Sequence, residues 1–244
     1  RQQNNFGEKA DIQQFNRLII NKKNVLKMAV WFQNAFRCIP PALTESLADT
    51  WQRDHASRAI ASWEFSPKQQ SRLQTRLGWQ DEFIAFHFAG KTEESHARTA
   101  QLGLEWQQKK GRMEWRFGAN TQYLRASSDG YKDKDAWYQQ TRLEGFASIE
   151  RAIAKGGKAS VLLRQSHASA QAAPFTWTLG LELPAGKTSL LHGHFSRNYN
   201  LPTFNDRFWE TLDSSTLSPE KGYSADFGWK FNRKHFGVDL TAFH

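Results

Sequence analysis

Two histidines, His192 and His194, stand two positions apart, a spacing that places both imidazole rings on one face of a β-strand. Imidazole nitrogens bind zinc, but a protein zinc site needs three or four ligands, with partners that orient them. His87, His96 and His167 lie in other segments of the chain. We therefore expect His192 and His194 to be a solvated pair and predict no metal site.

Nucleophilic chemistry also lacks a recognisable motif. Ser166-His167 joins a hydroxyl to an imidazole, but the sequence has no Gly-x-Ser-x-Gly run. Cys38 is the single cysteine, so it can form no internal disulfide, and no histidine motif accompanies it. Gly156-Gly157 lacks the Lys-Ser/Thr of a phosphate loop, and a tight turn explains it. We predict no catalytic residues and no cofactor; a membrane-embedded protease or lipase is a minor alternative.

The elements that carry these residues are strands, because apolar and polar residues alternate with period two along nearly the whole chain. About twelve such segments occur, most of them reaching the ~9–11 residues of a tilted membrane strand. The clearest apolar series, each alternating with polar residues, are Tyr223, Ala225, Phe227, Trp229 and Phe231; Phe175, Trp177, Leu179, Leu181 and Leu183; and Met113, Trp115, Phe117 and Ala119.

Tight and longer connections also alternate. The tight ones are rich in Lys and Gly and lie near residues 22–24, 67–70, 108–111, 155–158, 184–187 and 232–235. The longer links are predicted at about 40–50, 90–96, 127–135, 168–174 and 199–218. Outer-membrane barrels have short periplasmic turns and longer extracellular loops, so this alternation gives the predicted barrel an orientation. Six aromatic residues fall near tight turns, where an interfacial girdle is expected: Phe65, Trp106, Trp115, Trp229, Phe231 and Phe236.

Composition agrees with a barrel wall. Aromatic residues make up 14% of the chain although its mean hydropathy is -0.70, and no apolar run approaches the ~18 residues of a membrane helix. The net charge of +9 is spread over turns, loops and polar strand faces, so we predict no nucleic-acid partner. The fold class predicted is an all-β, antiparallel up-and-down transmembrane barrel. A soluble antiparallel β-protein is the alternative, although its strands would be shorter.

Residues 195–232 carry two linked motifs, an Arg-x-Pro-Thr-Phe-Asn-Asp-like run and a Leu-x-Pro-Glu-like strand opening. Their positions are Arg197, Pro202, Thr203, Phe204, Asn205, Asp206 and Trp209, then Leu217, Pro219 and Glu220. This stretch resembles the C-terminal barrel segment of TonB-dependent outer-membrane receptors. Residues 28–64 resemble an earlier barrel hairpin of that family more weakly.

The resemblance implies a receptor of the Gram-negative outer membrane that takes up a scarce nutrient such as an iron–siderophore or a corrinoid. A complete receptor of this kind has a segment that contacts TonB, a plug domain and about twenty-two strands. Residues 1–244 are then expected to form a partial barrel domain of about twelve strands, with the plug and the terminal strands absent. The expected partners are outer-membrane lipid, TonB acting through the plug, and a cargo such as a metal chelate. The alternative is a passive porin-like or structural barrel.

The motif residues are expected to be structural. Pro202 lacks an N–H and so ends ladder pairing where a strand gives way to a loop, and Pro219 does the same before the next strand begins. Glu220 is then placed to meet arginine or backbone donors at the barrel rim. Cargo is expected to contact aromatic and amide side chains of the outer loops, namely Tyr199, Asn200, Phe208, Trp209, Tyr131, Trp137 and Tyr138.

Overall fold

A computed structural model describes residues 6–40, 49–153, 156–169, 171–210 and 217–244. These residues form one antiparallel sheet of twelve strands that pair in chain order, and one short helix. The elements are β1 (Gly7–Asn21), β2 (Asn24–Cys38), β3 (Trp51–Lys68), β4 (Ser71–Phe88), β5 (Lys91–Lys110), β6 (Met113–Ser128), β7 (Tyr138–Ala152), β8 (Lys158–Ala168), β9 (Thr176–Pro184), β10 (Ser189–Asn200), α1 (Phe204–Phe208), β11 (Glu220–Arg233) and β12 (Phe236–Phe243). None of the described helical residues makes a helix long and apolar enough to span a membrane.

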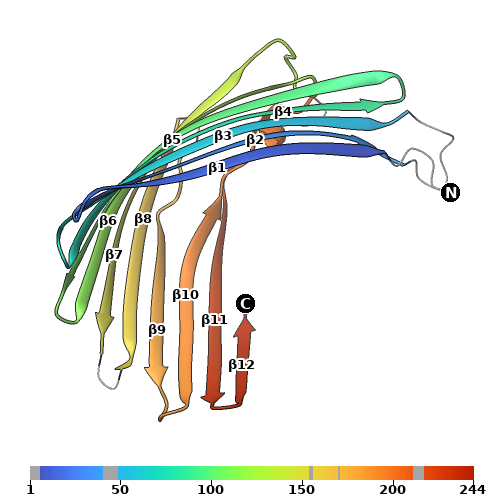
Figure 1. Ribbon diagram of the computed structural model, residues 1–244. Helices are drawn as coiled ribbons and strands as arrows, with labels where there is room; N and C mark the ends of the chain where they lie inside the picture. Colours follow the sequence, from blue (N-terminus) through green and yellow to red (C-terminus); the bar gives the residue numbers. More distant parts are fainter. Residues whose placement is uncertain (1–5, 41–48, 154–155, 170, 211–216) are drawn as a thin grey trace.

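The sheet curves into an open arc, with β1 and β12 at its two ends (Figure 1). Each strand between them pairs with its neighbours in sequence on both sides, which confirms the predicted up-and-down order. Several strands are longer than those of a typical soluble sheet: β5 runs for 20 residues, whereas the usual length is about 5–6. The arc is not closed among the described residues, as expected for part of a barrel.

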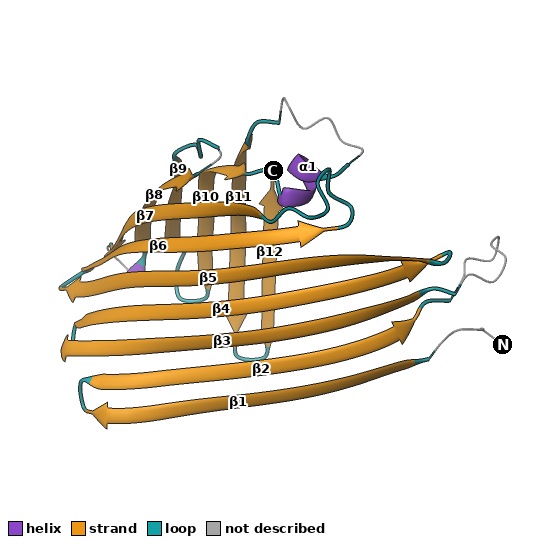
Figure 2. Cartoon of the chain, turned by 90° about the horizontal axis from the view of Figure 1, so that it is seen from above, coloured by secondary structure: helices purple, strands orange, loops and turns teal. Residues whose placement is uncertain are grey.

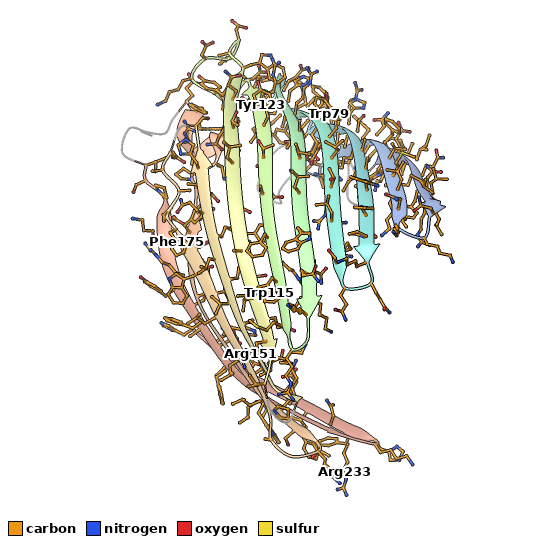
Figure 3. All side chains as sticks on the ribbon, turned by 90° about the vertical axis from the view of Figure 1, so that its left-hand side faces the viewer. Trp79, Trp115, Tyr123, Arg151, Phe175 and Arg233 are labelled. Atoms are coloured by element: carbon orange, nitrogen blue, oxygen red, sulfur yellow. The ribbon has the colours of Figure 1, made fainter. Side chains whose placement is uncertain are left out.

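The strand register assigns each side chain to one of two faces. Trp79, Ala100 and Tyr123 are cross-strand partners on β4, β5 and β6, so their side chains share the convex face. The apolar residues of every alternating series described above fall on this same face. Figure 3 looks onto the outer side of the arc, where Trp79, Tyr123 and Trp115 are labelled along these strands. The predicted alternation is therefore confirmed, and the apolar face is the outer one.

The concave face is polar, and its charges are paired across strands. Lys27 bonds to Glu64 at 2.5 Å, Arg58 bonds to Glu82, and Arg76 reaches Glu105 at 3.3 Å. Glu144 on β7 accepts a hydrogen bond from Ser166, whose side chain is only 2% exposed, at 3.0 Å. Paired charges of this kind suit a water-filled interior, in which neither partner is fully desolvated.

The six tight turns all lie at one end of the strands, between β1 and β2 and then at every second connection. The predicted girdle aromatics occupy the convex face near these turns. The ring centroids of Trp229 and Phe231 lie 5.9 Å apart and those of Phe231 and Phe236 6.5 Å apart, and Trp106 lies 5.8 Å from the neighbouring ring of Phe117. Trp115 lies at this level of the outer face (Figure 3).

One predicted link is wrong. The chain was expected to form a longer loop at about 90–96, but β4 passes into β5 through Ala89 and Gly90 alone. Both residues have positive φ, 50° and 79°, as a two-residue type I′ hairpin requires. The polar run after them extends β5, since His87 pairs with Thr92 and Phe83 with His96. The links at 129–137, 169–175 and 201–219 agree with prediction; most of the link at 40–50 falls on residues 41–48, outside the described residues.

Candidate cargo-binding rim

Two of the longer links meet at the end of the sheet opposite the tight turns. The amide of Lys132 donates to the carbonyl of Phe208 at 2.9 Å, and the amide of Glu210 donates to the carbonyl of Gly130 at 2.9 Å. Tyr131 and Trp209 form an antiparallel bridge between these bonds. A short backbone ladder therefore ties the β6–β7 link to the β10–β11 link.

The β10–β11 link contains α1, which begins at a capping box. The amide of Asp206 donates to the Thr203 hydroxyl at 3.2 Å, while the Asp206 carboxylate accepts from the Thr203 amide at 2.7 Å. These reciprocal bonds satisfy amides that a helix start leaves free. Hydrogen bonds from the Thr203 hydroxyl and amide hold the pKa of Asp206 below its ordinary value. β10 ends at Asn200, two residues before Pro202, and β11 begins at Glu220, directly after Pro219.

We expect the capping box to open only in acid. Because the pKa of Asp206 is lower in the folded chain than in the unfolded one, its stabilising effect is present above the unfolded pKa. That effect is lost as pH falls through the folded value, in the range below about 4. Protection factors of the Thr203 and Asp206 amides, from hydrogen exchange corrected for intrinsic rates, should fall there. The variant Asp206→Asn should show weaker protection at pH 7 and no such transition; an equal transition in both chains would contradict this assignment.

α1 folds inward over the concave face and packs against β5 and β6. Phe204 is 7% exposed and Tyr131 4% exposed, and together with Ala126 of β6 they form a small core that Ala97 and Leu124 border. Seen from above, α1 lies inside the curve of the sheet, near the end of β6 (Figure 2). A segment that follows β10 in sequence therefore covers β5 and β6 at the end of the sheet opposite the tight turns, which we call the mouth.

The aromatic side chains of the two links form one cluster, which we call the rim cluster: Tyr131, Tyr138, Phe204, Phe208 and Trp209. Tyr138 and Phe208 stack with ring centroids 3.9 Å apart. The Tyr131 hydroxyl donates to Asn205 Oδ1 at 3.0 Å, and burial raises the pKa of Tyr131, so this hydroxyl stays a proton donor across the physiological range. Within the cluster, Tyr131 and Phe204 are buried and structural, whereas Tyr138, Phe208 and Trp209 keep partly exposed faces.

The seven predicted cargo contacts therefore separate into three groups. Tyr131, Tyr138, Phe208 and Trp209 come together in the rim cluster. Tyr199 and the adjacent Asn200 end β10, where Tyr199 packs against Ala168, Ala173 and Leu201. Trp137 lies elsewhere, beside Arg98 and Arg125 on the outer face.

Two residues at the rim were not predicted to contact cargo. Asn205, predicted as a structural motif residue, is the hydrogen-bond partner of Tyr131. Arg207 places its guanidinium 4.6 Å from the Phe208 ring centre, and desolvation lowers its pKa. The Thr203-x-x-Asp206 spacing was a usable signal for the helix start, whereas nothing in the sequence indicated the contact of Tyr131 with Asn205, 74 residues away.

The remaining motif and histidine positions lie on the strands. Arg197 pairs with Tyr223 across β10 and β11, and Glu220 pairs with Asn200, so both stand near the mouth end. His194 Nδ1 lies 3.1 Å from Asp226 Oδ1 on the concave face, and the His192 ring centroid is 6.5 Å away from that of His194. No group of three metal-ligating side chains occurs among the residues that the structure describes.

No protein-family model matches this sequence, and no curated protein matches it. Solved structures match its fold. The siderophore receptor PirA from Pseudomonas aeruginosa superposes with a TM-score of 0.83 at 10% identity, over 97% of this chain and 45% of that one. The alcaligin outer-membrane receptor FauA from Bordetella pertussis gives 0.72 at 12% identity, over 97% and 43%. The copper transporter OprC gives 0.77 at 10%, over 97% and 46%.

This chain thus has the fold of a barrel segment of such receptors and spans a little under half of their length. Identity this low shows the fold alone.

Proposed function

We propose that this chain is a wall segment of a TonB-dependent receptor in a Gram-negative outer membrane, and that the parent protein takes up a metal chelate. The observation that carries this proposal is that the twelve-stranded arc has an apolar outer face and an inner face of paired charges. Its fold is similar to that of a siderophore-receptor barrel. A lipid-facing wall around a wet interior requires that pairing. TonB would act through a plug that is not among these residues.

The rim cluster is the proposed cargo surface. Tyr138, Phe208 and Trp209 present partly exposed rings, and Lys132, Asp133, Lys134 and Asp135 stand exposed beside them. Aromatic rings and charged groups together suit a ligand with planar or apolar parts and an anionic metal-binding part. Iron–siderophore complexes have this character, and corrinoids share part of it.

Replacing the two stacked rings, in Tyr138→Ala/Phe208→Ala, should weaken cargo binding by roughly tenfold, since an aromatic contact contributes about 0.5–1.5 kcal/mol beyond its buried area. The full-length protein would be titrated calorimetrically with ferric catecholate, hydroxamate and citrate complexes. Phe236→Ala, an exposed ring at the opposite end of the sheet, is the matched control and should bind as the wild type does. Equal affinities for all three chains would remove cargo contact from the rim cluster.

A passive porin-like barrel is the second candidate, and conductance separates the two. The inward-folded α1 narrows the mouth, which favours a receptor over an open channel. In planar bilayers the full-length protein should show little steady conductance and should bind at least one ferric complex. A large ohmic conductance without binding of any complex would favour the passive channel.

A further inference from the structure

Two arginines lie side by side on the mostly apolar convex face. Asp81, Arg98, Arg125 and Gln139 are successive cross-strand partners on β4, β5, β6 and β7. Their side chains share the convex face with Trp79, Ala100 and Tyr123, which form the next row toward the tight turns. A pair of guanidinium groups on the outer wall is unexpected, because the concave face takes most of the paired charge.

Trp137 holds these two arginines together. The Arg125 guanidinium carbon lies 4.1 Å from the Trp137 ring centre, and that of Arg98 lies 5.3 Å away. Trp137 itself keeps 37% of its surface exposed. Cations over an indole face are attracted by its quadrupole, so the ring orders both side chains without neutralising either. We call Asp81, Arg98, Arg125 and Trp137 the outer arginine patch.

The charge of the outer arginine patch is unbalanced. Asp81 Oδ2 accepts from Arg98 Nε at 2.8 Å, and within the described part of the chain Arg98 forms no other ion pair. The terminal amino groups of Arg98, whose side chain is 41% exposed, thus remain free for another partner. Arg125 forms no ion pair with any described residue, so two guanidinium groups face one carboxylate.

The height of the patch points to its ligand. Tyr123 and Trp115 stand on the outer face of β6 about eight residues apart, which is roughly 26 Å along the strand at about 3.3 Å per residue. Because barrel strands are tilted by about 35–45°, this distance corresponds to roughly 20 Å of height, and Arg125, two residues further along β6, lies roughly 25 Å above Trp115. That height is close to the ~25 Å of an apolar band bounded by aromatic girdles. Trp79 and Tyr123 lie near the loop end and Trp115 lies below them in Figure 3. The Tyr123 hydroxyl donates to Gln139, on the patch row, at 2.8 Å, so the patch begins where the apolar band ends.

We propose that the outer arginine patch binds the phosphate group of a phosphorylated lipid in the outer leaflet. Guanidinium groups recognise phosphate through paired charge-assisted hydrogen bonds. On the outer face, at the edge of the apolar band, the patch lies at the level of the lipid headgroups, which favours a lipid phosphate over a soluble anion. The inference rests on the proposed outer-membrane location and is independent of cargo and of TonB.

The test compares the full-length protein with its Arg125→Gln variant, both refolded in detergent and examined by native mass spectrometry. Among the described residues, no carboxylate forms an ion pair with Arg125, so the substitution leaves no carboxylate unpaired. The bond between Asp81 and Arg98 also remains in place. The probe is a bisphosphorylated glycolipid of the lipid A type. Loss of a charged hydrogen-bond partner should weaken its binding about tenfold. Arg164→Gln, on the concave face, should bind within about twofold of the wild type, as expected for changes outside the site.

Three further arms define the outcome. The dephosphorylated glycolipid should bind the wild type no better than the phosphorylated one binds Arg125→Gln. Inorganic phosphate at millimolar concentration should not displace the lipid; if it does, the site is one for free phosphate and the proposal is overturned. Equal retention by wild type and Arg125→Gln also overturns it. A wild type that fails to insert into lipid vesicles would instead contradict the membrane location itself.

Discussion

Leu179→Arg should destabilise the full-length protein in lipid vesicles by about 2–4 kcal/mol, the effect of an arginine near the bilayer midplane on the lipid face of a barrel. Leu179 lies near the middle of β9, between Val161 and Phe195, and its side chain is exposed on the convex face. No acidic partner stands beside it in the described register, so the guanidinium would face hydrocarbon. Urea titration of the refolded protein, followed by tryptophan emission, measures the change.

The matched control is the preceding residue. Thr178 pairs with Leu162 and Ser196 on the concave face, where an arginine side chain can reach water and carboxylates. Thr178→Arg should therefore change the free energy of unfolding by less than about 1 kcal/mol. Equal destabilisation by the two substitutions would show that the assignment of lipid and interior faces is wrong.

Gly130→Val should separate the two links of the rim. A side chain at Gly130 would place its Cβ 2.6–2.9 Å from three atoms of the Trp209 indole, closer than real Cβ contacts allow. The ring would have to leave its site, and overpacking of this kind typically costs about 1–3 kcal/mol. The hydrogen bonds of Lys132 and Glu210 across the links would then weaken. Hydrogen exchange of these two amides should accelerate by at least tenfold, which corresponds to about 1.4 kcal/mol.

Gly145→Val serves as the control, because nothing lies within 4 Å of a Cβ at that position on β7. A β-branched residue is favoured in strands, so this change should leave exchange at Lys132 and Glu210 untouched. If Gly130→Val also leaves these amides protected, the hydrogen bonds between the links do not depend on the packing of the Trp209 ring against Gly130.

The wall could be predicted from sequence because each of its features is local. The alternation of Tyr223, Phe227 and Trp229 assigns their face without knowledge of any other strand. The failure at 90–96 has a physical reason: Lys91-Thr92-Glu93-Glu94-Ser95 is polar enough to read as a loop, but on a strand end beyond the apolar band both faces meet water. Polar composition then no longer distinguishes strand from loop.

The rim was only partly predictable, because its geometry depends on contacts between distant segments. Tyr131, Tyr138, Phe208 and Trp209 were selected by residue type, and the structure brings them together. Trp137 directly precedes Tyr138 but lies beside Arg125 on the outer face, so residue type could not distinguish the two neighbours. The sequence carried no signal for the pairing of the β6–β7 and β10–β11 links.

That pairing has a mechanical consequence for the arc. The β6–β7 and β10–β11 links emerge several strands apart on a curved sheet, yet hydrogen bonds join them inside the curve. They span the arc from β6 to β11 as a chord. Such a chord resists changes in the radius of its arc, because flattening or tightening of β7–β10 would strain the Lys132–Phe208 and Gly130–Glu210 bonds. The diameter of the mouth is therefore coupled to the hydrogen bonding between the two links.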